Sequence, residues 1–135
     1  YLSYNKIITI PISIGNLINL KRLELNYNQI ITLPIEIGKL TNLISLDLSY
    51  NKIITIPIEI GNLINLKSIW SFNNQIKIIP IEIGNLKKLK ALLIDNNPIM
   101  FPPEHIMRKG NGEVIEYLEK KFENKGIICL FIYLY

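Results

Sequence analysis

Residues 43–65 read LISLDLSYNKIITIPIEIGNLIN, and the same unit returns every 23 residues along the chain. The positions that mark it hold asparagine (Asn5, Asn28, Asn51, Asn74, Asn97), proline (Pro11, Pro34, Pro57, Pro80, Pro103) and glycine (Gly15, Gly38, Gly61, Gly84). The first half of the unit fits the pattern L-x-x-L-x-L-x-x-N-x-L, with isoleucine in the last slot. Such a unit cannot bury its apolar face alone, so the repeats are predicted to stack into a solenoid.

The first half of the unit predicts a short strand followed by a turn. In Leu46-Asp47-Leu48 apolar and polar residues alternate, which places both leucines inward and Asp47 outward. The asparagine after the strand can bond backbone groups that the turn would otherwise leave buried and unpaired. Stacked repeats are therefore expected to form an asparagine ladder of Asn5, Asn28, Asn51, Asn74 and Asn97.

The second half predicts a short helical turn that begins near Pro57 and that the chain leaves at Gly61. Its expected apolar side consists of Ile58, Ile60 and Leu63. The repeated Glu36, Glu59 and Glu82 could form a carboxylate row, but their place beside proline favours simple first-turn charges. His105 occupies the same slot and is expected at the surface.

These motifs resemble the leucine-rich repeat family, specifically its 23-residue intracellular class with L-P-x-E-I-G-x-L in the second half, and are similar to Scribble, Erbin and the plant intracellular Ras-group-related proteins. The resemblance implies an α/β repeat fold, a leucine-rich-repeat solenoid with a curved parallel β-sheet on its concave face. Short helices or 3-10 turns would line the convex face, and a capping helix would close the C-terminal end. Residues 1–110 then comprise one partial repeat, three full repeats and one degenerate terminal repeat.

The two ends of the array differ. By register Tyr1 corresponds to Asp47, so the chain is expected to begin inside a strand without a cap, as a fragment would. Residues 111–125 are predicted to form an amphipathic cap helix that ends at Gly126. Its apolar side would hold Val114, Ile115, Leu118 and Phe122.

Residues 126–135 form an apolar tail, IICLFIYLY after Gly126. Nine apolar residues are too few to span a bilayer, which needs about 20. Three interpretations stay open: a final strand packed on the cap, a membrane-touching tail, or a reading frame that has lost its proper end.

The composition excludes most site chemistry. The chain of 135 residues is at most one domain, and its lone Cys129 and lone His105 are too few for zinc, haem or iron–sulfur ligation, so no metal and no cofactor is expected. His105 has no obvious nucleophilic partner, so the protein is not expected to be an enzyme. Without a continuous apolar stretch in the first 30 residues, a cytoplasmic location is the expectation.

Partner binding is expected on the outward positions of the strands, because the core consumes the inward ones. The candidate residues are Glu24, Tyr27, Asp47, Tyr50, Trp70, Phe72, Leu93 and Asp95. Aromatic residues ringed by polar groups are typical of protein-binding hot spots. Alternatively, the tyrosines and Trp70 stack along the solenoid and fill gaps between repeats. The net charge of +4 comes from scattered lysines, so nucleic acid is an unlikely partner.

One local departure affects this surface. Ser71 occupies the inward slot that Leu25 and Leu48 hold in other repeats. Either Trp70 and Phe72 both face outward, or the strand bulges and turns Phe72 inward; the retained Asn74 spacing favours the first arrangement.

The sequence thus favours a non-enzymatic protein–protein interaction module, a cytoplasmic signalling scaffold or adaptor. The resemblance implies a small GTPase, kinase or phosphatase as partner. Two alternatives are the recognition fragment of a larger signalling enzyme or receptor, and a membrane-peripheral structural protein that uses its apolar tail.

Overall fold

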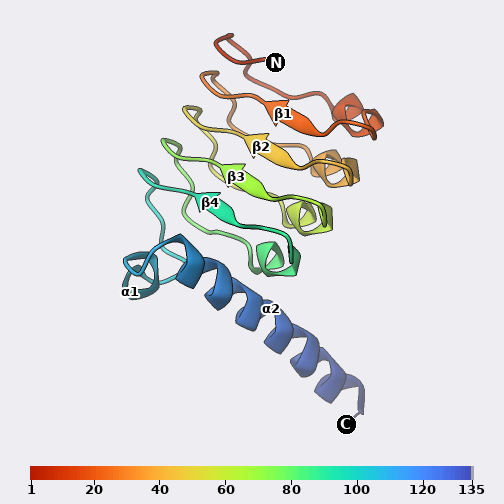
Figure 1. The fold of residues 1–135 in the computed structure, drawn as a ribbon, viewed down its shortest axis with the longest axis vertical. Helices are drawn as coiled ribbons and strands as arrows, with labels where there is room; N and C mark the ends of the chain where they lie inside the picture. The colour runs from red at the N-terminus through yellow and green to blue at the C-terminus, as the bar shows by residue number, and fades with distance from the viewer. Residues whose placement is uncertain (135) are drawn as a thin grey trace.

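The computed structural model describes residues 1–134, with the backbone alone at residues 129, 131 and 133. Tyr135, the last residue of the expected tail, lies outside the described residues. The described chain stacks its repeats side by side, with strands along one face and short turns along the other (Figure 1). The predicted α/β solenoid is confirmed.

Four short strands form a parallel sheet in the order β1-β2-β3-β4 (Figure 1). They are β1 (Arg22–Glu24), β2 (Ser45–Asp47), β3 (Ser68–Trp70) and β4 (Ala91–Leu93). Each strand residue pairs with its equivalent one repeat later, so Leu46 lies between Leu23 and Ile69. The register of the sheet therefore equals the period of the sequence.

The segment before β1 continues this pattern without forming an assigned strand. The amide of Leu2 donates to the Glu24 carbonyl at 3.0 Å, and the amide of Tyr4 donates to the Asn26 carbonyl at 3.1 Å. The expected strand at Tyr1 is thus replaced by an extended segment that hydrogen-bonds to the edge of β1.

The opposite face of the solenoid carries one 3-10 helix per repeat. These are η1 (Ile12–Asn16), η2 (Ile35–Lys39), η3 (Ile58–Asn62) and η4 (Ile81–Asn85). A proline stands immediately before each one in an extended conformation, as Pro57 does with φ −65° and ψ 147°. Since proline has no N–H to leave unpaired and a fixed φ, it suits this entry to a helical turn.

The apolar side of the turn differs from the prediction at one position. Ile60 and Leu63 are fully buried, as expected, but the side chain of Ile58 is 58% exposed. A 3-10 helix has three residues per turn and spans only five residues here, so Ile58 at its first position points away from the core that Ile60 enters.

The predicted role of Gly61 is also wrong. Gly61 lies inside η3 and not at its exit, and its φ is not in the left-handed region. A Cβ built on Gly61 would lie 2.7 Å from the carbonyl oxygen of Glu82 in the next turn. Glycine is required here because neighbouring 3-10 helices approach each other closely.

One continuous core runs between the two faces. Inward leucines and isoleucines such as Leu25, Leu48 and Ile53 are fully buried, and the same slots are filled in repeat after repeat. Burial of each such side chain contributes about 1.5–3 kcal/mol. The core is therefore shared between repeats, which is why no repeat is expected to be stable alone.

The asparagine side chains cross-link successive repeats. The Asn51 amide group donates to the carbonyls of Leu48 at 3.0 Å and Leu25 at 2.9 Å, and its Oδ1 accepts from the amide of Ile30 at 3.0 Å. Asn28, Asn74 and Asn97 repeat this set of bonds. Asn5 donates within its own turn, to the carbonyls of Leu2 and Ser3.

Two helices close the C-terminal end of the array: α1 (Glu104–Met107) and α2 (Asn111–Leu134). Val114 and Leu118 of α2 are buried in the solenoid core, whereas Ile115 and Phe122 on the predicted side are half-buried. The structure therefore places the apolar side of this helix against the last repeat (Figure 1).

Asn111 protects the free edge of β4. Its Oδ1 accepts from the amide of Leu92 at 2.6 Å, and its Nδ2 donates to the carbonyl of Lys90 at 3.0 Å. The side chain thereby pairs backbone groups at the edge of the last strand, which limits pairing with another chain.

The far end of α2 contradicts two expectations. The helix does not end at Gly126 but continues to Leu134, so the segment after Gly126 is helical and is not a final strand packed on the cap. Gly126 has no positive φ, and a Cβ built on it would have no atom within 4 Å, so nothing at this residue interrupts the helix.

Candidate protein-binding site

The outward side chains of the four strands form the strand face of the solenoid. In its central row Glu24, Asp47, Trp70 and Leu93 lie side by side in register, one from each strand. Trp70 is 40% exposed and Leu93 is 37% exposed, while Glu24 is half-buried. The middle and C-terminal part of the row is therefore the accessible part.

Asp47 is not the exposed acid that the sequence predicts. It is only 9% exposed, and its Oδ1 accepts a hydrogen bond of 3.0 Å from the amide of Ser49. The larger side chains of Glu24 and Trp70 flank it in the neighbouring strands. Its carboxylate is thus used within the turn that follows β2, and it offers little surface to a partner.

Phe72 and Ser71 follow the first of the two predicted arrangements. Ser71 is fully buried, and its amide donates to the carbonyl of Leu93 at 2.7 Å, so the strand register continues without a bulge. Phe72 is half-buried on the outward side, beside Trp70. We call Trp70, Phe72 and Leu93 the strand-face patch.

An aromatic stack borders this patch. The rings of Tyr4 and Tyr27 stack with centroids 4.4 Å apart, and those of Tyr27 and Tyr50 stack at 4.2 Å. Phe72 then meets Tyr50 edge to face at 5.3 Å. The predicted alternative of stacking along the solenoid therefore holds for the tyrosines, whereas Trp70 takes no part in a ring contact within the described residues.

The tyrosines of the stack stand on an unusual backbone. Tyr4, Tyr27, Tyr50, Asn73 and Asn96 occupy the same slot of successive repeats, and all have φ between 53° and 58°. This left-handed conformation is common for asparagine and rare for tyrosine. Sequence reasoning missed this feature, although Asn73 and Asn96 in the slot were a usable signal.

Close contact within the stack raises the pKa of one tyrosine. The hydrogen bond with the Tyr50 hydroxyl raises the pKa of Tyr27 above its ordinary value of 10.0, and burial adds to the effect. A hydrogen bond to the protonated hydroxyl favours its neutral form, so Tyr27 keeps its proton near neutral pH and can donate a hydrogen bond.

Acidic and polar groups flank the strand-face patch. Asp95 occupies the position equivalent to Phe72 one repeat later, and it is exposed. It borders a hollow of about 270 Å³ between the last repeat and α1. Beyond it, Asn96 donates to the Oδ1 of Asn73 at 3.2 Å. The accessible surface therefore combines an apolar centre with a carboxylate at one side and tyrosines at the other.

The remaining candidates lie elsewhere. Glu36, Glu59 and Glu82 begin their 3-10 helices as first-turn charges, and Glu82 Oε1 also pairs with Lys125 Nζ at 2.7 Å. His105 is exposed on α1. Within residues 1–134 no group of His, Cys, Asp or Glu could hold a metal ion.

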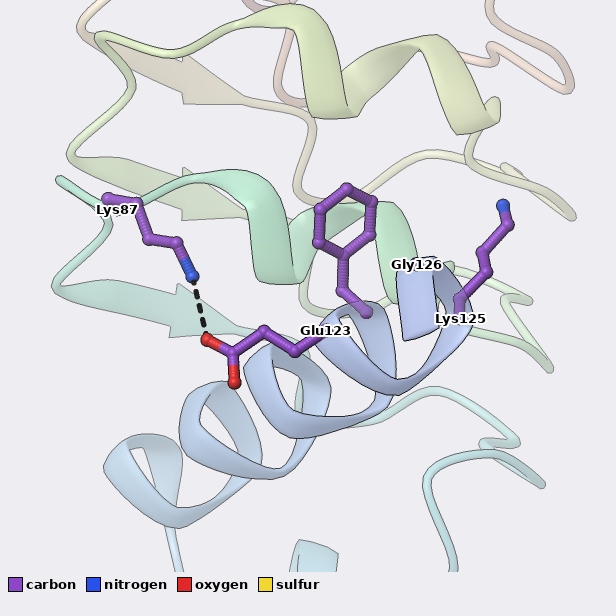
Figure 2. Close-up of a pocket in the computed structure, with 5 residues that line it drawn as sticks. Lys87, Glu123, Lys125 and Gly126 are labelled. Carbon is purple, nitrogen blue, oxygen red and sulfur yellow. Dashed lines mark ion pairs between the residues drawn. The ribbon is translucent and has the colours of Figure 1, made fainter. Parts of the chain in front are cut away.

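A second hollow, of about 390 Å³, lies on the other side of the molecule, between the last repeat and α2. Its lining includes Phe122 and Gly126 of α2, and Lys87 and Glu123 form an ion pair of 3.6 Å across it. Figure 2 shows this ion pair on one side of the hollow, with Lys125 and Gly126 on the other. The Lys87–Glu123 pair thus links α2 to the last repeat at the surface.

A parallel sheet on one face, 3-10 turns on the other and an asparagine ladder between them define a repeat solenoid with a free strand face. Residues 1–110 match the leucine-rich repeat region family. The chain therefore belongs to the leucine-rich repeat family, whose domains are protein-interaction modules and are typically non-enzymatic.

Solved structures agree with this assignment. A leucine-rich repeat protein of Leptospira interrogans matches with a TM-score of 0.71 and 36% identity, over 80% of this chain and 34% of that one. The Arabidopsis thaliana receptor kinase ectodomain GASSHO1/SCHENGEN3, in complex with Casparian strip integrity factor 2, matches with a TM-score of 0.68 and 41% identity over 73% and 12%. The plant peptide hormone receptor RGFR1, in complex with RGF2, matches with a TM-score of 0.67 and 37% identity over 72% and 16%.

The chain thus spans between 12% and 34% of the length of these structures. Among curated proteins, none matches the chain.

Proposed function

We propose that the protein is a non-enzymatic module that binds a protein or peptide partner on its strand face, with Trp70 as the anchor. The observation that carries the proposal is the position of Trp70. It stands at the middle of the array, in register with Leu93, and it is exposed without a stacking partner among the described rings. An exposed tryptophan at the centre of an apolar patch with polar groups at its edges has the character of a binding hot spot.

The surroundings of the anchor indicate the chemistry of the partner. Asp95 places an exposed carboxylate beside the strand-face patch, and the half-buried Glu24 lies further along the same face. The tyrosine stack presents hydroxyl groups on the other side. A segment with an apolar or aromatic side chain flanked by lysine or arginine would match this surface. Two of the similar structures are receptors in complex with a ligand, and one of them is a peptide hormone receptor, which supports a protein or peptide partner.

The finer parts of the proposal are expectations from the sequence. The resemblance supports membership of the 23-residue intracellular class, a role as signalling scaffold or adaptor, and a small GTPase, kinase or phosphatase as partner. The cytoplasmic location is the expectation from the first 30 residues. An extracellular partner found for the full-length protein would remove these parts and leave the binding surface in place.

The test is selection of binding peptides from a displayed random library on the immobilised chain. Because Trp70 is the only tryptophan, its fluorescence reports contact with each selected, tryptophan-free peptide directly. We expect Trp70→Ala to weaken binding by about 2 kcal/mol or more, roughly the hot-spot threshold. Ile58→Ala is the matched control, because it removes an exposed apolar side chain from the opposite face.

Two results would oppose the proposal. If Trp70→Ala and Ile58→Ala weaken binding equally, the strand face is not the site. If Trp70→Ala lowers the free energy of unfolding by several kcal/mol while the binding per folded molecule is unchanged, Trp70 serves solenoid packing.

A further inference from the structure

The end of α2 beyond Gly126 is an exposed apolar feature that the strand face does not explain. The described side chains there are Ile127, Ile128, Leu130, Ile132 and Leu134, and they are between 51% and 75% exposed. A soluble surface normally carries such residues singly, so a contiguous exposed group marks an interaction site.

The array itself does not cover this segment. The buried residues of α2 are Val114 and Leu118 near its start, and the ion pairs from Glu123 and Lys125 are its last described charged contacts with the repeats. After Gly126 the helix projects beyond the solenoid (Figure 1). The segment is therefore free to meet a surface outside the molecule.

The pattern of the segment distinguishes between possible surfaces. The five described side chains of the segment, Ile127, Ile128, Leu130, Ile132 and Leu134, are all apolar and exposed, and at about 3.6 residues per turn they spread over about 200° of the helix circumference. A protein groove or a second helix covers only one stripe of a helix. The opposite side of such a helix faces water and carries polar residues. Acyl chains can surround a helix on all sides.

Length and flanking charges agree with a lipid surface. At about 1.5 Å per residue the eight described positions 127–134 are about 12 Å long, so they fit within one leaflet of a hydrocarbon core about 30 Å thick. No helix within the described residues is long and apolar enough to cross a membrane. The stretch before Gly126 carries both lysine and glutamate, at Lys120, Lys121 and Glu123, which suits a headgroup region of mixed charge.

We propose that the helical segment 127–134 docks the protein onto the surface of a lipid bilayer by inserting its apolar side chains among the acyl chains of one leaflet. Leu130 lies only about 6 Å along the helix from Gly126, so its side chain enters the leaflet near the headgroups. Since the apolar side chains supply the attraction, zwitterionic lipid suffices and anionic lipid adds little.

The first experiment is sedimentation of the full chain with phosphatidylcholine vesicles. We expect the double substitution I128N/L130N to lower the partition coefficient at least tenfold. The matched control is I35N/I58N, because these two side chains on the 3-10 helices are exposed to the same degree. All four side chains are exposed, so the variants should fold, and circular dichroism spectra test this.

The second experiment locates the contact. In a W70F background, Leu130→Trp places a single tryptophan in the segment. We expect its emission to shift to the blue with vesicles and to be quenched more by lipids brominated near the headgroup than near the chain end. In the parent chain, Trp70 should show no such change, which separates this proposal from binding by the strand face.

Three outcomes would overturn the proposal. The first is an absence of vesicle binding by the parent chain. The second is an equal loss of binding in the control variant I35N/I58N, which would move the contact to the 3-10 face. The third is a dimer in sedimentation equilibrium without lipid that I128N/L130N dissociates, together with no vesicle binding, because a second copy would then cover the segment.

Discussion

Two neighbouring residues at the end of each strand meet two separate backbone requirements. The ladder asparagine, such as Asn51, pairs buried donors and acceptors of two repeats. The residue before it, such as Tyr50 or Asn73, takes a left-handed φ so that the chain can turn away from the strand. The ladder asparagine is needed for its hydrogen bonds, whereas the residue before it must tolerate an unfavourable backbone conformation.

Asn51→Ala should lower the free energy of unfolding by about 1–3 kcal/mol, because it leaves the buried Ile30 amide without a partner and removes one of the two asparagine donors from each of the Leu25 and Leu48 carbonyls. The denaturant midpoint measures this loss. Asn42→Ala is the matched control, since Asn42 donates one bond to the Ile18 carbonyl at an exposed site. Equal effects of the two substitutions would contradict the buried-ladder explanation.

At position 50 glycine should be more stable than alanine by about 1 kcal/mol, because only glycine adopts φ near 55° without a Cβ clash. Both variants lose the ring of Tyr50 equally, so their difference isolates the backbone. At Ser45, inside β2, the order should reverse. Unfolding curves for the four variants measure these differences in stability. If the alanine variant at position 50 were more stable than the glycine variant, the explanation by backbone strain would be wrong.

At the scale of elements, packing distances between turns decide which residues are allowed. The four 3-10 helices stand side by side, and their glycines lie where a Cβ would meet the next turn. Gly84 repeats the arrangement at the end of the array, with a Cβ position 2.3 Å from the carbonyl oxygen of Leu118 in α2. The capping helix thus takes the place that a further 3-10 helix would occupy.

Gly61→Ala should destabilise the protein by about 1–3 kcal/mol, because the new methyl group would push η3 away from Glu82. Gly126→Ala should not lower the denaturation midpoint, and it should raise the helical signal in circular dichroism. No atom lies within 4 Å of the Gly126 Cβ position, and alanine favours a helix interior. If both substitutions lowered the stability by similar amounts, the close approach of the turns would not explain the need for glycine at position 61.

At the scale of the whole molecule, the two ends of α2 have opposite relations to the solenoid. The start closes the core with Val114 and Leu118 and pairs the edge of β4 through Asn111. The end carries exposed apolar side chains away from the repeats (Figure 1). Stability should therefore depend on the first half of the helix, and solubility on the second.

Removal of residues 127–135 should raise solubility and leave the melting temperature unchanged, because the described side chains removed are all exposed. Leu118→Ala should instead lower the free energy of unfolding by about 2–5 kcal/mol by opening a cavity under the cap. Thermal melting and light scattering measure the two effects. A lower melting temperature after truncation would show that the tail is part of the folded core.

The sequence by itself determined the architecture, because its signals are local and recur in every repeat. They are the 23-residue period, the alternation around Leu46, and the recurring asparagine and proline, and each copy predicts the same strand and turn. It also placed Trp70, Phe72 and Leu93 on the outward side of the strands. Self-consistency among repeats made this possible, since any error in register would have recurred at every copy.

Only the tertiary structure decided what depends on neighbours in space. The burial of Asp47 between Glu24 and Trp70, the close approach at Gly61 and the stack of Tyr27 on Tyr50 involve residues one repeat apart. The course of α2 past Gly126 was likewise hidden, because glycine permits a helix stop without requiring one. A pattern within one repeat states which way a side chain leaves the backbone, but the space left for that side chain is set by the adjacent repeats.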